Sequence, residues 1–133
     1  MFSKSNLAST IVGAIWAYAG GYLLWDVIGS GLMENPGPSE ADTVHLIIAC
    51  VILAFVANVF YSKGANNHSI SAGATFGLWL GILIGFGERW FDVAFGYQTS
   101  MNDAIVNGVL NVVWAIVLGI LFSLVHGKMS SSD

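Results

Sequence analysis

Residues 69–87 read SISAGATFGLWLGILIGFG, a stretch without a single charged side chain. A helix needs about 20 such residues to cross a hydrocarbon core roughly 30 Å thick. Three further stretches free of Lys, Arg, Asp and Glu have a similar length, and they cover residues 7–25, 43–61 and 104–125. A transmembrane barrel would alternate apolar and polar residues over short segments instead, so helices are the expected spanning elements.

The composition of the chain agrees with this interpretation. Of its 133 residues, 56% are hydrophobic and only 9% are charged, a balance typical of membrane proteins and not of soluble domains. We therefore predict an all-α, four-transmembrane-helix bundle that forms a single integral membrane domain over residues 1–133. The predicted spans are about 7–28, 43–61, 69–92 and 103–126.

The distribution of charge orients this bundle. Lys4, Lys63 and Lys128 fall on one side of the predicted membrane. Seven of the eight acidic residues fall on the other side together with Arg89: Asp26, Glu34, Glu40, Asp42, Glu88, Asp92 and Asp103. Because Lys and Arg accumulate on the cytoplasmic side, we expect both termini in the cytoplasm and the chain in the inner (plasma) membrane of a cell.

Glycine recurs at every fourth position of the quoted stretch, at Gly73, Gly77, Gly81 and Gly85. Similar stripes of small residues recur in the first and last spans, at Ser9, Gly13, Ala17 and Gly21 and at Ala115, Gly119, Ser123 and Gly127. Small residues let helix backbones approach closely in lipid, so each stripe is a packing face inside one bundle or between subunits. Four helices have limited interior for three such faces, which favours a homo-oligomer.

A faint internal repeat relates the two halves of the chain. The segment Trp25-Asp26-Val27 closes the first span, and Trp90-Phe91-Asp92-Val93 closes the third. The chain is then two tandem helical hairpins, and in a membrane protein built from repeats a binding site lies near the interface of the halves. Helices of few residue types also produce such matches by chance, so both explanations stay open.

Polar residues lie mainly near the outer ends of the predicted spans, where ionisable groups are the first place to look for function. A polar path with an acidic outer mouth would use Glu88, Asp92, Asp103, Asn107 and Asn111. In lipid, the side chains of Asn58 and Asn111 need hydrogen-bond partners. They either form hydrogen bonds between helices or belong to this path.

A second hypothesis for the same region is a divalent-metal site or proton relay formed by His45, Glu88 and Asp92. In the alternative, Arg89 pairs with Asp92 or Asp26, the remaining acids are solvated, and no metal is bound. His68 and His126 are expected at the cytoplasmic interface.

Three tryptophans, Trp16, Trp79 and Trp114, fall near mid-depth, away from the interfaces where Trp is usual. They either fill the core beside the small residues or wall an apolar pocket for a flat lipophilic ligand such as a quinone or pigment. The spacing of these residues identifies no particular cofactor.

Several function classes are excluded by what the sequence lacks. A formal net charge of -4 with four basic residues argues against nucleic acid as a partner. The chain contains no Walker loop, two-His zinc motif, CxxC pair or Ser-His-Asp constellation, so we predict that it is not an enzyme. The single cysteine, Cys50, is expected in the core.

Two short motifs resemble a known family. They are Gly13-Ala14-Ile15-Trp16 in the first span and Ile105-Val106-Asn107-Gly108 at the start of the last. With the four spans, they resemble small bacterial four-helix membrane proteins grouped as domain of unknown function 1761, over most of the chain from Gly13 to Gly119. Where that family has a tyrosine soon after the Asn of the last helix, this chain has Leu110 and Asn111. The resemblance implies the four-helix topology and no site residues.

Two functional hypotheses follow. The first is an oligomeric channel or transporter for a small solute or cation, with an acidic outer mouth. The second is a non-conducting accessory or scaffold subunit that binds lipid, pigment or the helices of a partner in a membrane complex. Both place the chain in the lipid bilayer.

Overall fold

The structure, a computed structural model, describes residues 4–33, 43–64, 67–96 and 100–129. Every regular element within these ranges is a helix. The elements join into four helical segments, each long and apolar enough to cross a membrane: Lys4–Ile28, Thr43–Gly64, Ile70–Ala94 and Met101–Met129. The expected all-α chain of four long apolar helices is therefore confirmed in the described part.

Two of the four segments are regular α-helices, α2 (Thr43–Gly64) and the long α5 (Met101–Met129). The other two change helix type along their length. The first consists of α1 (Lys4–Gly21) and the π-helix η1 (Tyr22–Ile28), followed by the 3-10 turn η2 (Gly29–Gly31). The third consists of α3 (Ile70–Ile82), the π-helix η3 (Leu83–Glu88) and the short α4 (Trp90–Ala94).

The helix starts and stops are set by local chemistry. Ser69 caps α3, because its Oγ accepts a hydrogen bond from the backbone N–H of Ala72 at 3.0 Å. Ser100 caps α5 in the same way by accepting from the N–H of Asp103 at 3.2 Å. Asp103 itself lies in the first turn of α5, where the helix dipole favours a carboxylate. Gly96 has a φ of 79°, a value that suits glycine, and it follows the end of α4.

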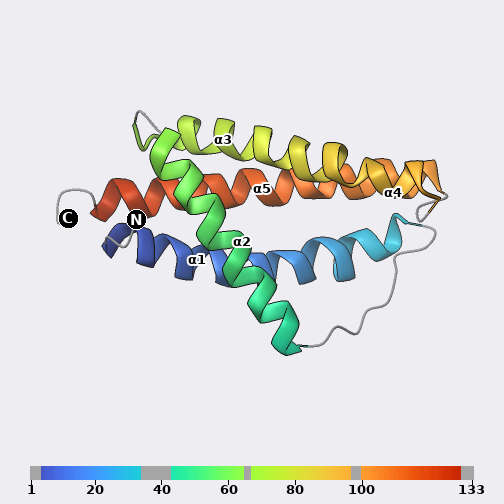
Figure 1. The fold of residues 1–133 in the computed structure, drawn as a ribbon, viewed down its shortest axis with the longest axis horizontal. Helices are drawn as coiled ribbons and strands as arrows, with labels where there is room; N and C mark the ends of the chain where they lie inside the picture. The colour runs from blue at the N-terminus through green and yellow to red at the C-terminus, as the bar shows by residue number, and fades with distance from the viewer. Residues whose placement is uncertain (1–3, 34–42, 65–66, 97–99, 130–133) are drawn as a thin grey trace.

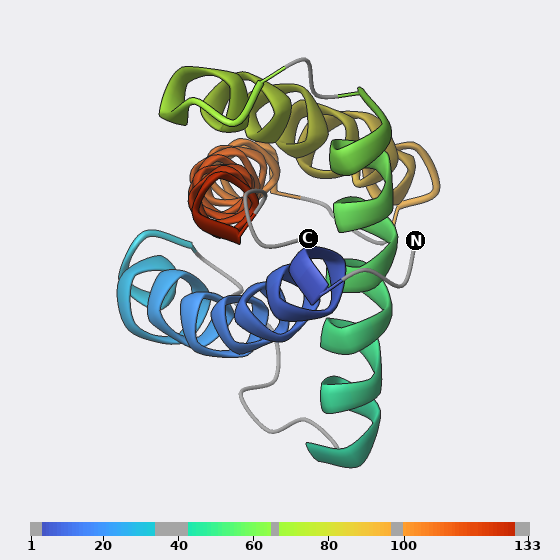
Figure 2. The same ribbon diagram turned by 90° about the vertical axis from the view of Figure 1, so that its left-hand side faces the viewer.

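The helices form an uneven bundle (Figure 1). α1, α3 and α5 run alongside one another with α5 in the middle, whereas α2 crosses them obliquely, and the end-on view of Figure 2 shows the same inclination. Neighbours in sequence pack together, α1 with α2 and α3 with α5, and α1 joins these pairs by packing on α5. α5 is the most buried of the four segments.

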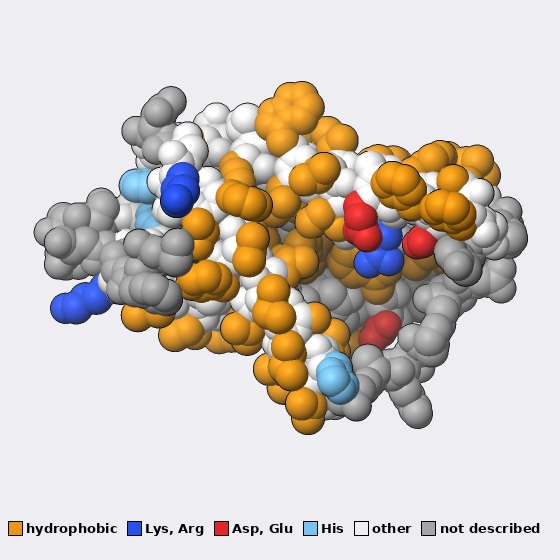
Figure 3. Space-filling model, viewed as in Figure 1, with side chains coloured by type: hydrophobic (Ala, Val, Ile, Leu, Met, Phe, Trp, Pro, Cys, Tyr) orange, Lys and Arg blue, Asp and Glu red, His pale blue; other side chains and the backbone are white. Residues whose placement is uncertain are grey.

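Four helix termini meet at one end of this arrangement, where α1 begins, α2 ends, α3 begins and α5 ends (Figure 1). We call it the lysine end, because Lys4, Lys63 and Lys128 belong to these termini. On the face shown in Figure 3, a band of hydrophobic side chains separates the basic groups at this end from the acidic groups towards the other. Such a band is what a bilayer would cover.

The glycine stripe of α3 packs directly on the backbone of α5. A Cβ added at Gly77 would overlap the carbonyl oxygen of Ala115, and one added at Gly81 would lie 2.5 Å from Cα of Val112. Likewise, Gly73 faces the backbone of Gly119. This face is thus occupied by a helix of the same chain, which corresponds to the first of the two alternatives for the stripe, packing inside one bundle.

The other two stripes also pack mainly within the chain, and in each of them one predicted member is not buried. A Cβ at Gly13 would meet side chains of α5 and α2, at 2.8 Å from Phe122 and 3.2 Å from Ala54. Gly21 has nothing within 4 Å of such an atom, and Gly20 is the buried glycine of this turn. On α5, Ala115, Gly119 and Ser123 are buried, but Gly127 is exposed. The facing stripes of α3 and α5 interlock, so they need less interior than three separate faces would.

Candidate functional site

Polar and aromatic side chains from three helices and from the connection between α2 and α3 converge at the lysine end. Asn6 comes from α1, Asn58 and Tyr61 from α2, His68 from the connection before α3, and His126 from the last turns of α5. We call these five residues the polar cluster. Asn58 is fully buried, and Asn6, Tyr61 and His126 are each at least nine-tenths buried. Buried polar groups are costly unless they bond to one another, so their grouping lowers the free-energy cost of burying each of them.

A chain of hydrogen bonds links three helices through this cluster. Nδ2 of Asn58 donates to Oδ1 of Asn6 at 2.9 Å and to the backbone oxygen of Asn6 at 3.3 Å. Oδ1 of Asn58 lies 2.8 Å from Nε2 of His126. Because an amide oxygen only accepts, Nε2 of His126 must carry the hydrogen of this bond. The bonds therefore tie α2 to α1 on one side and to α5 on the other.

Tyr61 is the aromatic centre of the cluster. Its ring contacts Phe76 of α3 edge-on at 5.5 Å between centroids, and it lies 5.8 Å from Phe122 and 5.3 Å from His126. The hydroxyl of Tyr61 lies 2.9 Å from Nδ1 of His68. His68 in turn stacks on His126 with the ring planes 19° apart and the centroids 5.2 Å apart. The two imidazoles thus form a stacked pair on Tyr61.

One buried group beside the cluster lacks a partner. Ser9, one turn along α1 from Asn6, is fully buried, and its Oγ has no hydrogen-bond partner in the described part of the chain. Ser123, across on α5, avoids this situation by donating to the backbone oxygen of Ile120 at 2.8 Å. An unpaired buried hydroxyl costs free energy, so Ser9 is a weak point of the packing.

The charges around the polar cluster have one sign. Lys4, Lys63 and Lys128 are exposed at this end, and the described residues 4–10, 58–64, 67–70 and 119–129 contain no Asp or Glu. Among the described residues at this end, a cation would meet only positive charges. An anionic group would find complementary charge instead.

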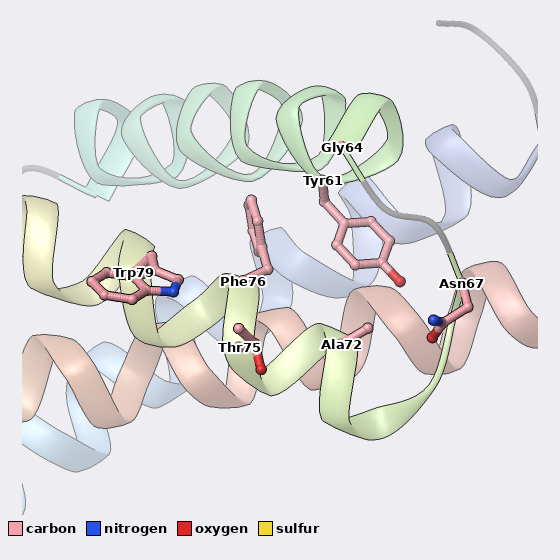
Figure 4. Close-up of a pocket in the computed structure, with 7 residues that line it drawn as sticks. All are labelled: Tyr61, Gly64, Asn67, Ala72, Thr75, Phe76 and Trp79. Carbon is pink, nitrogen blue, oxygen red and sulfur yellow. The ribbon is translucent and has the colours of Figure 1, made fainter.

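A pocket of about 380 Å³ lies next to Tyr61, between the end of α2 and the first half of α3. We call it the α2–α3 pocket, and its lining residues are Tyr61, Gly64, Asn67, Ala72, Thr75, Phe76 and Trp79. Figure 4 shows that the residues are graded along its length, with Trp79 and Phe76 towards one end and Asn67 at the other. The pocket therefore offers an apolar end and a hydrogen-bonding end, the latter beside the α2–α3 connection.

A second pocket, of about 430 Å³, lies where α2 diverges from α1. Its lining is apolar apart from the ring hydroxyl of Tyr18 and the thiol of Cys50: Ala14, Ile15, Tyr18, Ala19, Ile47, Cys50 and Val51. Both pockets include residues of the inclined α2, whose first seven residues are exposed. Both are on the sides of the helices, and neither includes a residue of the predicted polar path.

The three mid-depth tryptophans do not form one pocket. Nε1 of Trp16 donates to the backbone oxygen of Trp114 at 2.9 Å, so the Trp16 ring lies against the backbone of α5, and both residues belong to the packing of the core. Trp79 is 65% exposed on α3 and belongs to the α2–α3 pocket instead. The predicted wall of three tryptophans is corrected accordingly: two fill the core and the third lines a separate cavity.

The predicted polar path is only partly assembled. Asp103 and Asn111 are buried on α5, and the half-buried Asn107 lies between them. Oδ1 of Asn107 accepts from Nε1 of Trp25 at 2.5 Å, and Nδ2 of Asn111 donates to the backbone oxygen of Asn107 at 2.9 Å. Glu88 is exposed, so it does not continue this buried line.

The predicted metal site is not formed. His45 and Glu88 are exposed and Asp92 is half-buried, and the described residues contain no group of three His, Cys, Asp or Glu side chains placed to hold a metal ion. Three convergent ligands are the minimum that such a site needs. The predicted outer-side acids Glu34, Glu40 and Asp42 lie outside the described residues.

Comparisons with protein-family models, with curated protein sequences and with solved structures each found no match. The resemblance to domain of unknown function 1761 therefore stays a prediction.

The sequence alone does not predict the polar cluster, because its members are far apart in the chain. His126 was expected at an interface, yet it is buried against Asn58, 68 residues away. One signal was available: Ser5, Asn6, Ser9 and Thr10 place four polar residues in the first turns of an otherwise apolar helix, and all four are buried. Polar residues of this density at one end of a span need partners on neighbouring helices.

Proposed function

We propose that the chain is a non-enzymatic, multi-pass protein of the inner membrane that binds a lipophilic ligand at the side of its bundle. It acts as an accessory subunit and conducts no solute. The observation that carries this proposal is the position of the two pockets, which open beside α2 and are lined mainly by apolar residues. Ligand pockets of a few hundred Å³ with a small number of polar groups are typical of small-molecule sites.

The packing between the helices supports the non-conducting alternative. The backbones of α3 and α5 touch along the glycine stripe, which leaves no room for side chains, let alone a path, between them. The amides that a path would need are bonded to their neighbours, Asn111 to Asn107 and Asn107 to Trp25. The glycine stripe, the predicted contact between the subunits of an oligomeric channel, packs on α5 of the same chain, and this favours the non-conducting alternative.

The proposed orientation of the chain in the membrane follows from the position of the lysines. With the lysine end in the cytoplasm, the polar cluster and the hydrogen-bonding end of the α2–α3 pocket lie at the inner interface. A ligand would then enter the pocket sideways from the inner leaflet. The apolar end of the pocket would point towards the middle of the membrane.

Flux through reconstituted vesicles tests the proposal. We expect the rates of Na⁺, K⁺ and proton entry to equal those of empty vesicles, and we expect organic extraction of the purified protein to release a lipophilic molecule. Saturable permeation that Glu88→Gln or Asp92→Asn reduces would overturn the non-conducting function. Extraction that releases no more lipophilic material than detergent micelles contain would overturn the binding function.

A further inference from the structure

The α2–α3 pocket has a polarity that matches one particular class of molecule. Trp79 and Phe76 form its apolar end, and Asn67 and the last residue of α2, Gly64, form its polar end (Figure 4). The polar end lies at the lysine end of the molecule, and the hydrophobic band of Figure 3 begins next to the basic side chains of that end. The gradient in the pocket thus has the same direction as the gradient from headgroup to acyl chain in a bilayer.

The polar end offers hydrogen-bond donors, and a basic residue directly precedes one of its lining residues in the sequence. Oδ1 of Asn67 accepts from the backbone N–H of Ser69 at 3.0 Å, which leaves the two N–H bonds of its Nδ2 for a ligand. Lys63 is the basic residue of the last turn of α2, directly before Gly64 of the pocket lining, and it is exposed. An ammonium group and amide donors together suit an anionic group with several acceptor oxygens, such as a phosphodiester.

The apolar end offers an aromatic surface that faces outwards. Trp79 is 65% exposed although it is the largest side chain of α3, and its ring lies in the pocket lining with Phe76. Phe76 is held in place by its edge-on contact with the buried Tyr61. A flexible hydrocarbon chain can lie along these rings while the remainder of the chain stays in the surrounding lipid.

We infer that the α2–α3 pocket binds one anionic phospholipid of the inner leaflet, with its phosphate at Lys63 and Asn67 and an acyl chain along Phe76 and Trp79. Charge decides the class, because the described residues at this end include three lysines and no carboxylate. The volume of about 380 Å³ holds the glycerophosphate part and the first segment of a chain, not a whole lipid. This inference rests on the proposed function, since it names the ligand of the same pocket.

Native mass spectrometry of the detergent-purified protein, titrated with equal amounts of phosphatidylglycerol and phosphatidylcholine, tests the inference. We expect one phosphatidylglycerol per chain to survive activation that removes phosphatidylcholine. The substitution Lys63→Gln should reduce this preference about fivefold, the effect of one basic residue near an anionic surface. Trp79→Ala should weaken retention of both lipids. Leu83→Ala is the matched control, because Leu83 is also 65% exposed on the same helical segment but does not line the pocket.

Fluorescence quenching gives a second measurement that does not depend on detergent. The emission of Trp79 is the part of the tryptophan fluorescence that the substitution Trp79→Phe removes. Chain-brominated phosphatidylglycerol should quench this emission more strongly than chain-brominated phosphatidylcholine does at the same mole fraction. Equal quenching by the two lipids, or equal lipid retention in the Trp79→Ala and Leu83→Ala proteins, overturns the inference. A quinone or pigment in the pocket would overturn it and leave the proposed function standing, whereas cation flux with lipid still bound would overturn only the proposed function.

Discussion

At the scale of single residues, the hydrogen bond of the polar cluster that joins α2 to α5 depends on one donor atom, Nε2 of His126. Nε2 of His126 supplies the hydrogen that Oδ1 of Asn58 requires, and Asn58 is fully buried. Without that donor, the amide oxygen would remain in a low-dielectric environment with no partner on α5. The imidazole therefore holds α2 against α5 where these helices have few other contacts.

We predict that His126→Leu destabilises the folded protein by about 1–2 kcal/mol, because it removes the donor and leaves the amide oxygen of Asn58 unpaired. His126→Gln should cost less, since the glutamine amide can place a donor near the position of Nε2. Unfolding in mixed micelles of dodecyl maltoside and SDS measures both values. Equal stability of the leucine and glutamine variants would show that this hydrogen bond contributes nothing.

Ser9 gives the opposite prediction. Its hydroxyl is buried and unpaired, so Ser9→Ala removes an unsatisfied group and also places a better helix former in α1. We expect this variant to be more stable by roughly 0.5–1 kcal/mol in the same unfolding assay. Ser123→Ala, which removes a hydroxyl with a partner, is the comparison and should not be stabilising. Loss of stability in the Ser9 variant would mean that its oxygen has a partner after all.

At the scale of helices, the contact between α3 and α5 is backbone against backbone. Gly77→Ala would place a methyl group on the carbonyl of Ala115, which is main chain and cannot rotate away. We predict a loss of about 2 kcal/mol or more, since the two helices must separate to make room.

The matched control for this variant is Gly21→Ala, because a Cβ at Gly21 has nothing within 4 Å. It should be neutral or stabilising by up to about 1 kcal/mol, through reduced freedom of the unfolded chain. If both variants unfolded at the same SDS fraction, the close approach of α3 and α5 would be refuted.

The sequence predicts the helices well and their pairing less well. An uncharged stretch such as residues 69–87 has few alternatives to a helix in lipid, and its glycines mark a face that must pack closely. Nothing in the stripe itself says whether the partner is α5 or another subunit. The π-helices η1 and η3 are not predicted, because a mainly apolar stretch looks the same in the sequence whether it forms an α-helix or a π-helix.

The site was harder to predict than the helices for a physical reason. The polar cluster depends on contacts between Asn6, Asn58 and His126, whose distances in sequence are 52 and 68 residues. The pockets lie beside α2, which is inclined to the other helices (Figure 1) and approaches α1 closely where Gly13 faces Ala54. A crossing angle is a property of two surfaces together, and no single stretch of sequence contains it.

At the scale of the whole molecule, the orientation in the membrane can be tested with α5 alone. Its two ends carry the exposed residues Asn102 and Lys128. In a Cys50→Ala background, we predict that Asn102→Cys reacts with an impermeant maleimide added to intact cells and that Lys128→Cys reacts only after lysis. Lys63→Cys should behave like Lys128→Cys. Labelling of positions 63 and 102 from the same side would overturn the topology and, with it, the leaflet proposed for the lipid.

The inclination of α2 also has a mechanical consequence for the lipid around the protein. Its 22 residues make a rod of about 33 Å, and an inclined rod spans less height than its length, whereas the 29 residues of α5 reach about 44 Å. In a bilayer, lipids beside α2 would therefore have to shorten while those beside α5 would not, and this mismatch would deform the bilayer on one flank only. Two copies that share one thinned zone relieve part of that deformation. We expect such proteins to gather in thin or curved regions through the elasticity of the membrane, without any specific contact between them.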